Sequence, residues 1–425
     1  MSTIDELITI ISDRRPKKLD RKTQDKFSDL PIDLKHLILQ HLPIEEIVRT
    51  SILCTQWRHV IYSHPNLIFD QNSYDHWLKN QCYTPFKSPV DEFLKSIIQI
   101  LSNYTGLLER FILYVPYEEV WKNSHSLVRQ IVSVVPKTIT HLCVRNGAHD
   151  ECRLKISFFK ELTHLELDRC SIPSRLQTTL FPKLTQLDLR RVCNTHDLVH
   201  ALKRIAPRLE HLRLWSCYEL DHDGTTIDVP SLTELFMDKC CFYVLLSSDT
   251  SKLSSVTIGL DRHWSSLIGF HQHLHTLTRL EILDSYTFQV LCDLCQCLNQ
   301  MKLADDTSWA LQKLIIHGIN QSGSEGSVIG LVELLQRAKN VRELWIKDTT
   351  RRGRCQSDDS LPFRFKGVTL DRLRTLSFTI QCVSRVDVLL LKCLLGCAPA
   401  LVKLNIGFGG RLCVSERQNI EKKLL

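Results

Sequence analysis

The chain has 425 residues, of which 43% are hydrophobic and 24% charged, and its formal net charge is +7. This composition is ordinary for a soluble globular protein and excludes overall disorder. No run of about 18 apolar residues occurs, so we expect no membrane-spanning helix. The sequence also lacks the patterns of phosphate-binding loops, dinucleotide sites, nucleophile elbows and H-E-x-x-H zinc sites.

The first segment, residues 1–26, is basic, and its charges gather in 13–26 (DRRPKKLDRKTQDK). Such a run fits a nuclear targeting signal or a nucleic-acid-binding arm. Acidic residues interrupt it, however, which favours a solvated, disordered tail. The start of the chain lacks the basic residues and cleavage site of a secretory signal. We therefore expect an intracellular protein, cytoplasmic, nuclear or both, whose 17 cysteines are mainly reduced.

Residues 27–70 have the pattern of a small helical unit. The first predicted helix has one apolar face, with Leu34, Leu37, Ile38 and His41 at helical spacing. Pro43 ends it, and a second short helix carries Ile47 and Val48. The face of a third helix consists of Leu53, Trp57, Val60 and Ile61. A unit of about 40 residues is near the lower limit for independent folding. Part of its surface is therefore covered by a partner or by the rest of the chain, and the pattern alone leaves both open.

One cysteine in this unit, Cys54, lies near His59 in sequence and raises the question of a reactive thiol with a base. Positions i and i+5 of a helix point about 140° apart. Cys54 and His59 therefore cannot meet within one helix, and we expect no catalytic pair.

The pattern L-x-x-L-x-L, in strict or looser form, recurs twelve times, at 21 to 34 residues between successive starts. The copies begin at residues 108, 139, 162, 184, 209, 232, 253, 277, 311, 341, 373 and 401. This length and pattern are typical of leucine-rich repeats, each a strand followed by a return segment. Two return segments, 196–206 and 327–338, have helical periodicity. Because each repeat buries its apolar face by stacking on its neighbours, we expect an α/β solenoid, a horseshoe with parallel strands on its concave face.

Many of the cysteines have a place in this repeat. Cys170, Cys193, Cys217 and Cys240 lie eight or nine residues after the first Leu of their repeats. That is the Asn/Cys position of the repeat pattern, where a small buried thiol fills the turn after the strand. We therefore interpret these four as structural residues.

A second group, Cys292, Cys295 and Cys297, follows the histidine-rich stretch 271–275 and suggests zinc. However, Leu291, Leu294, Leu298 and Met301 form a helical stripe that includes Cys295. The other two thiols point about 140° apart on either flank, so they cannot close one tetrahedral site. We expect no metal and no cofactor.

The unit at 27–70 resembles an F-box. The family pattern has two Leu-Pro pairs, an Ile-Leu pair between them, then Ser-x-Leu and Trp-Arg. Here these are Leu30-Pro31, Ile38-Leu39, Leu42-Pro43, Ser51-Ile52-Leu53 and Trp57-Arg58, closed by Pro65 and Phe69. Cys54 stands where Ser is usual. The chain most closely resembles the plant F-box/leucine-rich-repeat (LRR) proteins, which implies a tail (1–26), an F-box (27–70), a helical connecting region (71–107) and an LRR domain (108–425).

This resemblance implies a substrate receptor of an SCF-type ubiquitin ligase. Such a receptor is not an enzyme: its F-box docks on a Skp-type adaptor, which links it to a cullin and a RING protein, and its repeats bind a protein target. No nucleic acid or membrane partner is implied. The resemblance assigns adaptor docking to Leu30, Pro31, Ile38, Leu42, Pro43, Val48 and Trp57.

Target binding is expected on the third, fifth and seventh residues of each repeat, because side chains alternate along a strand and these face the concave surface. The candidates are Arg190, Arg213, Trp215, Phe236, Arg279, Lys313, Trp345 and Lys347. Exposed aromatic residues among charges favour binding hot spots, although loops or helices burying them would be equally consistent. The loop 351–367 is a second candidate.

Two other functions remain open. One is an LRR scaffold that does not act through ubiquitination, and the other is a small-molecule receptor. Co-purification of adaptor and cullin tests the first alternative, and a ligand-dependent rise in thermal stability tests the second. The identity of the target cannot be read from the sequence.

Overall fold

The structure is a computed structural model, and it divides into two compact units. Unit 1 comprises Met1–Asn194 with Arg204–Ala206, and unit 2 comprises Thr195–Lys203 with Pro207–Leu425. The described residues are 30–39, 42, 44, 46–47, 60, 62–79, 88–117, 124–147, 152–171, 181–193, 196–217, 225–240, 244–247, 249–260, 273, 275–283, 309–317, 325–347, 365–380 and 385–408. Within these ranges, none of the helices has the length and apolar character needed to cross a membrane.

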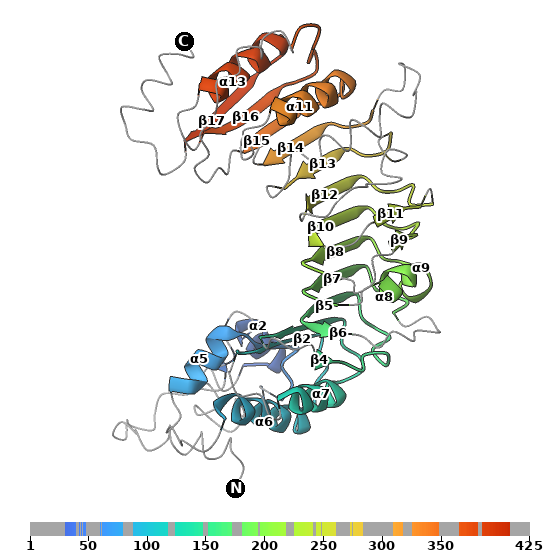
Figure 1. Cartoon of the computed structure of the whole chain (residues 1–425). Helices are drawn as coiled ribbons and strands as arrows, with labels where there is room; N and C mark the ends of the chain where they lie inside the picture. Colours follow the sequence, from blue (N-terminus) through green and yellow to red (C-terminus); the bar gives the residue numbers. More distant parts are fainter. Residues whose placement is uncertain are drawn as a thin grey trace, which may run out of the picture. The chain divides into compact units, whose positions relative to one another are not determined.

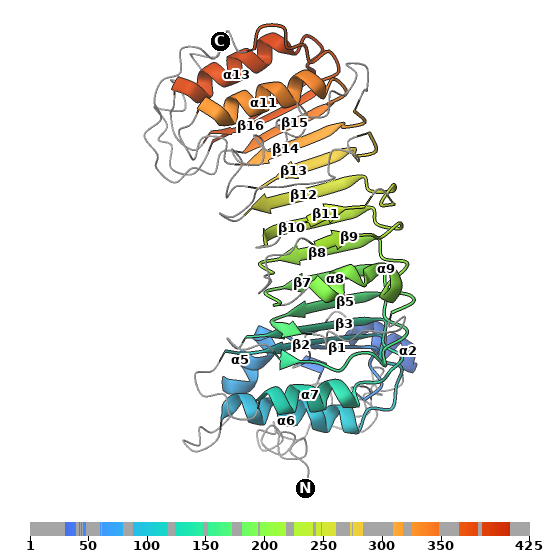
Figure 2. The same ribbon diagram turned by 45° about the vertical axis from the view of Figure 1, so that its right-hand side comes forward.

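Unit 1 contains a parallel sheet (Figures 1 and 2). Its strands pair in the order β1 (Asn66–Phe69), β2 (Arg110–Val115), β3 (His141–Asn146), β5 (His164–Asp168) and β7 (Gln186–Arg190). One row of the register joins Leu67, Phe111, Leu142, Leu165 and Leu187, all of them buried. Such rows of apolar side chains stabilise the sheet by burying one of its faces.

Helices and a second small sheet complete unit 1. The helices are α2 (Ile32–Leu39), α5 (Gln71–Lys79), α6 (Pro89–Ser102) and α7 (Ser124–Val134), and β4 (Cys152–Arg153) pairs with β6 (Cys170–Ser171). The start of α6 is capped, because Asp91 N donates to Ser88 Oγ (3.1 Å) and Pro89 occupies the first turn. The apolar face of α6 is buried and includes Val90, Phe93, Leu94, Ile97 and Leu101.

Unit 2 contains a parallel sheet of the same kind. Its strands pair in the order β8 (His211–Trp215), β10 (Glu234–Cys240), β12 (Ser255–Leu260), β13 (Arg279–Ile282), β14 (Lys313–His317), β15 (Glu343–Lys347), β16 (Thr375–Ile380) and β17 (Lys403–Phe408). The in-register row from Leu212 to Leu376 is buried, while its last member, Leu404 on β17, is 40% exposed.

The remaining elements are return segments. Unit 2 also contains the pair β9 (Thr225–Ile227) and β11 (Val244–Leu246) and the helices α11 (Glu325–Arg337) and α13 (Arg385–Cys397). The helix predicted over 196–206 is divided into α8 (His196–His200) and α9 (Leu202–Ile205), with its predicted apolar face buried. The helix predicted over 327–338 is α11, and its buried face includes Leu331, Leu334 and Leu335 as expected.

Each of the twelve predicted repeat copies carries one strand, which begins two residues after the first residue of the copy. The predicted mixed α/β class with parallel strands is therefore confirmed. The closing curvature of a horseshoe stays a prediction. The sheet also begins earlier than the repeats, since β1 lies at the end of the predicted F-box and pairs with β2.

The turns after four strands share a left-handed backbone. Arg169, Arg191, Ser216 and Lys239 have φ angles of 50°, 51°, 49° and 53°, a conformation that costs about 1 kcal/mol for residues other than glycine. Hydrogen bonds offset this cost: Arg169 N donates to Arg190 O (2.9 Å), and Ser216 N to Asp238 O (2.7 Å). Each turn thus bonds to the next strand.

The residue that follows each of these turns is buried, and here one prediction needs correction. Cys170, Cys217 and Cys240 occupy this position and are buried as expected. In the repeat beginning at residue 184, however, Val192 fills the position, and Cys193 is only half-buried. Offsets of eight and nine residues are therefore not equivalent, because the turn brings only the first of the two side chains inward.

A tight contact joins the segment before β1 to the loop before β2. Thr105 N and Gly106 N donate to Tyr62 O (2.8 and 3.1 Å), and Tyr104 Oη donates to His64 O (2.8 Å). A Cβ atom at Gly106 would lie 2.5 Å from Ser63 Cα and 2.6 Å from Ser63 O. Only glycine fits here, because both neighbours are backbone atoms.

We predict that Gly106→Ala destabilises the protein by about 1–3 kcal/mol, as overpacking does. The matched control is Gly396→Ala in α13, where a Cβ meets no atom within 4 Å, and there alanine should stabilise the helix by about 0.5–1 kcal/mol. Thermal melting of the two variants measures the difference. Equal melting temperatures would contradict the close contact at Gly106.

Candidate functional site

Helix α2 in unit 1 exposes its apolar side chains. Ile32, Leu34, Leu37 and Ile38 are 49%, 45%, 54% and 40% exposed, and the nearby Leu42 is 37% exposed. The opposite side of the helix, with Lys35 and Leu39, is buried instead. The face predicted from helical spacing therefore exists, but it points outward, and together with Leu42 we call it the α2 surface.

The predicted adaptor-binding residues fall partly on this surface. Ile38 and Leu42 belong to it, Pro31 is exposed beside it, and Leu30 is half-buried. Pro43, Val48 and Trp57 lie outside the described residues, as do Cys54 and His59. The sequence reasoning did not assign Ile32, Leu34 and Leu37 to binding. Helical periodicity grouped Leu34 and Leu37 with Ile38, but it gave no sign of which way the face points.

Histidine contacts hold α2 against the start of the sheet. His36 Nε2 lies 3.0 Å from Ser63 Oγ, and the His36 and His64 rings meet edge to face, with their centroids 5.9 Å apart. Burial lowers the pKa of both histidines. They are therefore neutral near pH 7, and they act as packing and hydrogen-bonding groups between α2 and β1.

A second surface follows the strands. We call the face made by the third, fifth and seventh residues of each repeat the front face. The alternate residues, such as Leu187 and Leu189 on β7, are buried, whereas Asp188 and Arg190 of the front face are half-exposed. In unit 1 its members are Arg110, Ile112, Tyr114, His141, Cys143, Arg145, His164, Glu166, Asp168, Gln186, Asp188 and Arg190.

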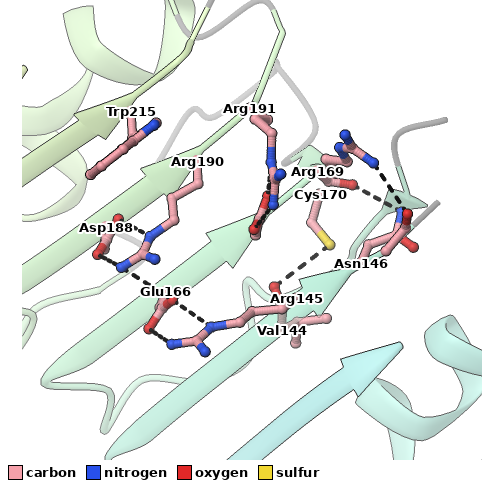
Figure 3. Close-up of polar contacts among 12 residues, drawn as sticks. Val144, Arg145, Asn146, Glu166, Arg169, Cys170, Asp188, Arg190, Arg191 and Trp215 are labelled. Atoms are coloured by element: carbon pink, nitrogen blue, oxygen red, sulfur yellow. Dashed lines mark hydrogen bonds and ion pairs between the residues drawn. The ribbon is translucent and has the colours of Figure 1, made fainter. Parts of the chain in front are cut away.

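Paired charges occupy the middle of the front face in unit 1 (Figure 3). Arg145 donates to both carboxylate oxygens of Glu166 (2.8 and 3.2 Å). Arg190 donates to both oxygens of Asp188 (3.1 and 2.8 Å) and lies 3.5 Å from Glu166. At the end of the strands, Arg191 pairs with Asp168. Bidentate pairs of this kind hold side chains in one geometry.

These pairs determine the charge states on the face. Burial raises the pKa of Glu166, but the hydrogen bond from Arg145 and the charges of Arg145 and Arg190 outweigh it and leave this pKa below its usual value. Burial and Glu166 raise the pKa of the Cys143 thiol to about 12. Burial, Arg110 and His164 lower the pKa of His141 to about 4. At neutral pH, Cys143 and His141 are both uncharged, which does not suit a thiolate nucleophile with an imidazolium partner.

The front face of unit 2 carries aromatic side chains. Trp215 on β8 stacks on Phe236 on β10, with ring centroids 5.6 Å apart, and Trp215 is 42% exposed. Glu234 lies beside them and pairs with His211 (3.1 Å) and Arg213 (3.4 Å). The stacked pair presents an apolar area bordered by charges.

A third tryptophan, Trp345 on β15, lies between two lysines. The amino groups of Lys313 and Lys347 are 5.0 and 5.8 Å from its ring centroid, within the range of cation–π attraction. Lys313 also pairs with Glu343 (2.7 Å). On β13 and β14, Glu281 accepts from Arg279 (2.7 Å) and lies 2.9 Å from His317 Nε2.

All eight predicted target-binding residues therefore occupy the strand positions assigned to them, Arg190 in unit 1 and the others in unit 2. One expectation needs correction, because only Trp215 is exposed. Phe236 and Trp345 are half-buried, as their neighbours on the same face cover part of each ring. Their role in binding stays a prediction.

Comparison with known proteins identifies the N-terminal unit. A family model described as "F-box domain" matches residues 27–69, the segment that contains the α2 surface. The chain therefore carries an F-box. F-box domains in general bind Skp-type adaptors, and F-box proteins are generally non-catalytic adaptor subunits.

Curated relatives from Arabidopsis thaliana combine this domain with repeats. F-box protein At5g03100 is 24% identical over 49% of this chain and 75% of its own length. F-box/FBD/LRR-repeat protein At1g13570 is 24% identical over 57% of this chain, and the match spans 55% of the relative. F-box/LRR-repeat protein 25 is 26% identical over 48% of this chain and 90% of its own length. The chain is of the plant F-box/LRR-repeat type.

The F-box/LRR-repeat chain shows no metal centre in its described portion. There, no group of three or more His, Cys, Asp or Glu side chains is placed to hold a metal ion. His273, from the predicted histidine-rich stretch, is buried, and its Nε2 lies 3.2 Å from Thr250 Oγ1. Cys292, Cys295 and Cys297 lie outside the described residues.

We predict that Glu166→Gln destabilises the protein by about 1–2 kcal/mol at pH 7, because it removes a charge that Arg145 and Arg190 require. The native pKa of Glu166 is lowered, so the carboxylate contributes stability above its unfolded pKa of about 4.3 and loses it as the pH falls through the native value. The difference between wild type and variant should therefore shrink below about pH 4. Urea unfolding at several pH values measures it.

The control for this experiment is Glu109→Gln, at an exposed residue of the same unit, which should change stability by less than about 0.5 kcal/mol at any pH. A pH-independent effect of Glu166→Gln would show that the Arg145 and Arg190 pairs are not what the variant loses.

Proposed function

We propose that this chain is the substrate-recognition subunit of an SCF-type ubiquitin ligase. In this proposal the α2 surface, with the rest of the F-box, docks on a Skp-type adaptor, and the front face binds the protein to be ubiquitinated. The adaptor in turn connects to a cullin and a RING protein. The proposed boundaries are 27–70 for the F-box, 71–107 for the connecting region and 108–425 for the repeats.

The observation that carries this proposal is the outward apolar face of α2. Ile32, Leu34, Leu37, Ile38 and Leu42 are each more than a third exposed within a stretch of eleven residues. A contiguous apolar surface on a soluble protein commonly marks a site of association. This one lies inside the segment matched by the F-box model, a domain that generally binds such adaptors.

The contacts within unit 1 support a receptor that works by positioning. Helix α2 is held to the segment before β1 by His36 and Ser63, and that segment is bonded to Tyr104 and Gly106. The α2 surface and the front face of unit 1 thus belong to one packed body. A target bound there would be held at a set distance from the adaptor, and proximity is a sufficient means of accelerating a transfer reaction.

The proposal predicts that Leu37→Lys abolishes adaptor binding. A charged side chain in a buried apolar contact costs several kcal/mol, so the affinity for the adaptor should fall by at least about tenfold. Because Leu37 is 54% exposed, the variant should melt within about 0.5 kcal/mol of wild type. Co-purification of a co-expressed Skp-type adaptor, together with a thermal melt, provides both measurements.

The matched control is Leu107→Lys. Leu107 is an apolar residue of unit 1 with still higher exposure, 76%, and it lies outside the F-box match. This variant should retain the adaptor. If Leu37→Lys also retained it while folding normally, the α2 surface would not be the docking site. If wild type retained no adaptor, the chain would be an LRR protein acting by another route.

A further inference from the structure

We propose that the front face over β13–β17 binds an acidic peptide segment, with Trp345 as its central contact. This inference rests on the proposed function in one respect, because the peptide is taken to be part of the ubiquitination target. The residues concerned are Arg279, Glu281, Lys313, His317, Glu343, Trp345, Lys347 and Lys403, all of them front-face positions in unit 2. We call them the basic patch.

The charges of the basic patch do not balance. Its cations are Arg279, Lys313, Lys347 and Lys403, and its acids are Glu281 and Glu343. Both acids are already engaged, Glu281 with Arg279 and His317, and Glu343 with Lys313. Within the described part of the chain, Lys347 and Lys403 have no carboxylate within ion-pair distance. The patch therefore offers uncompensated positive charge and no uncompensated negative charge.

This imbalance is not a general property of the front face. In unit 1, Arg145, Arg190 and Arg191 each pair with a carboxylate. On β8 and β10 of unit 2, Arg213 and His211 both pair with Glu234. Paired charges add little to the attraction of a charged ligand, whereas uncompensated charges steer it and select its sign.

Trp345 gives the patch an apolar centre. Its ring is half-buried and lies near two amino groups, and in the register it is flanked by Ile315 on β14 and Ser377 on β16. Tryptophan with adjacent cations is the combination most often found in binding hot spots. A peptide with an apolar side chain over Trp345 would place neighbouring Asp or Glu residues beside the lysines.

The small side chains of β16 leave room for such a peptide. Its front-face residues are Thr375, Ser377 and Thr379, whose hydroxyl groups can donate to carboxylates or to a peptide backbone. A nucleic acid is a poorer match. Binding a polyanion tightly requires many phosphate contacts, and only two of the four cations here are unpaired.

The test uses the full-length chain and a fluorescein-labelled peptide rich in Glu and Asp around one Leu. Fluorescence anisotropy should show binding that weakens as salt is added, because exposed charges are screened. Replacing Glu and Asp in the peptide by Gln and Asn should abolish it. In the protein, Lys347→Glu should weaken binding by at least about fivefold, whereas Lys347→Arg, which keeps the charge, should change it by less than about twofold.

The matched control is Lys392→Glu, which makes the same charge change at an exposed residue of α13 and should leave binding unchanged. Equal binding by wild type and Lys347→Glu, equal binding of the two peptides, or tighter binding of a single-stranded DNA of similar charge would each overturn the inference. The same Lys347→Glu protein should still co-purify with the adaptor. Loss of peptide binding with adaptor retained supports the inference, whereas a wild type that binds peptide but no adaptor would refute only the proposed ligase role.

Discussion

The in-register burial of the repeat leucines is the constraint on which the rest of this structure depends. Leu67, Phe111, Leu142, Leu165 and Leu187 form one such row in unit 1, and the row from Leu212 to Leu376 does the same in unit 2. Because side chains alternate along a strand, a slip of one residue would expose a whole row and bury the polar residues beside it. Burial of the rows therefore also decides which residues make up the front face.

The strands and their register could be predicted from the sequence, because both follow from the spacing of apolar residues. The same reasoning found α11 and the buried face of Leu198, Leu202 and Ile205. It missed β1, since the four residues Asn66–Phe69 are too short to show a period. It also misplaced Cys193, because one residue of offset cannot be resolved without knowing that Arg191 takes a left-handed conformation.

The sites were less predictable than the fold for a physical reason. Periodicity assigns a residue to a face, but the partners on that face come from several strands far apart in sequence. The contacts of Glu166 with Arg145 and Arg190 join three repeats, and the contact of Lys313 with Trp345 joins two. The outward direction of the α2 surface was likewise not contained in its spacing. It depends on which side of the helix packs, and there Lys35 and Leu39 are buried.

The two surfaces of the molecule have different physical characters, and this fits a division of roles. The α2 surface is apolar and uncharged, which suits a lasting contact with a partner of fixed identity. The front face is charged, with aromatic residues half-covered by their neighbours, which suits recognition that depends on charge and register. Within unit 1 the contacts of His36, Ser63 and Gly106 join the two surfaces, so neither moves independently of the other.

The separation of strand and return segment has a consequence for how such chains diversify. The strand starts advance from residue 164 to 186 between β5 and β7, and from 279 to 313 between β13 and β14. In both cases the facing residues pair one to one without a shift. Added residues are thus absorbed on the return side, away from the front face. Insertions and deletions there leave binding geometry intact, while point substitutions at strand positions change specificity without disturbing the core, so length and recognition can evolve independently.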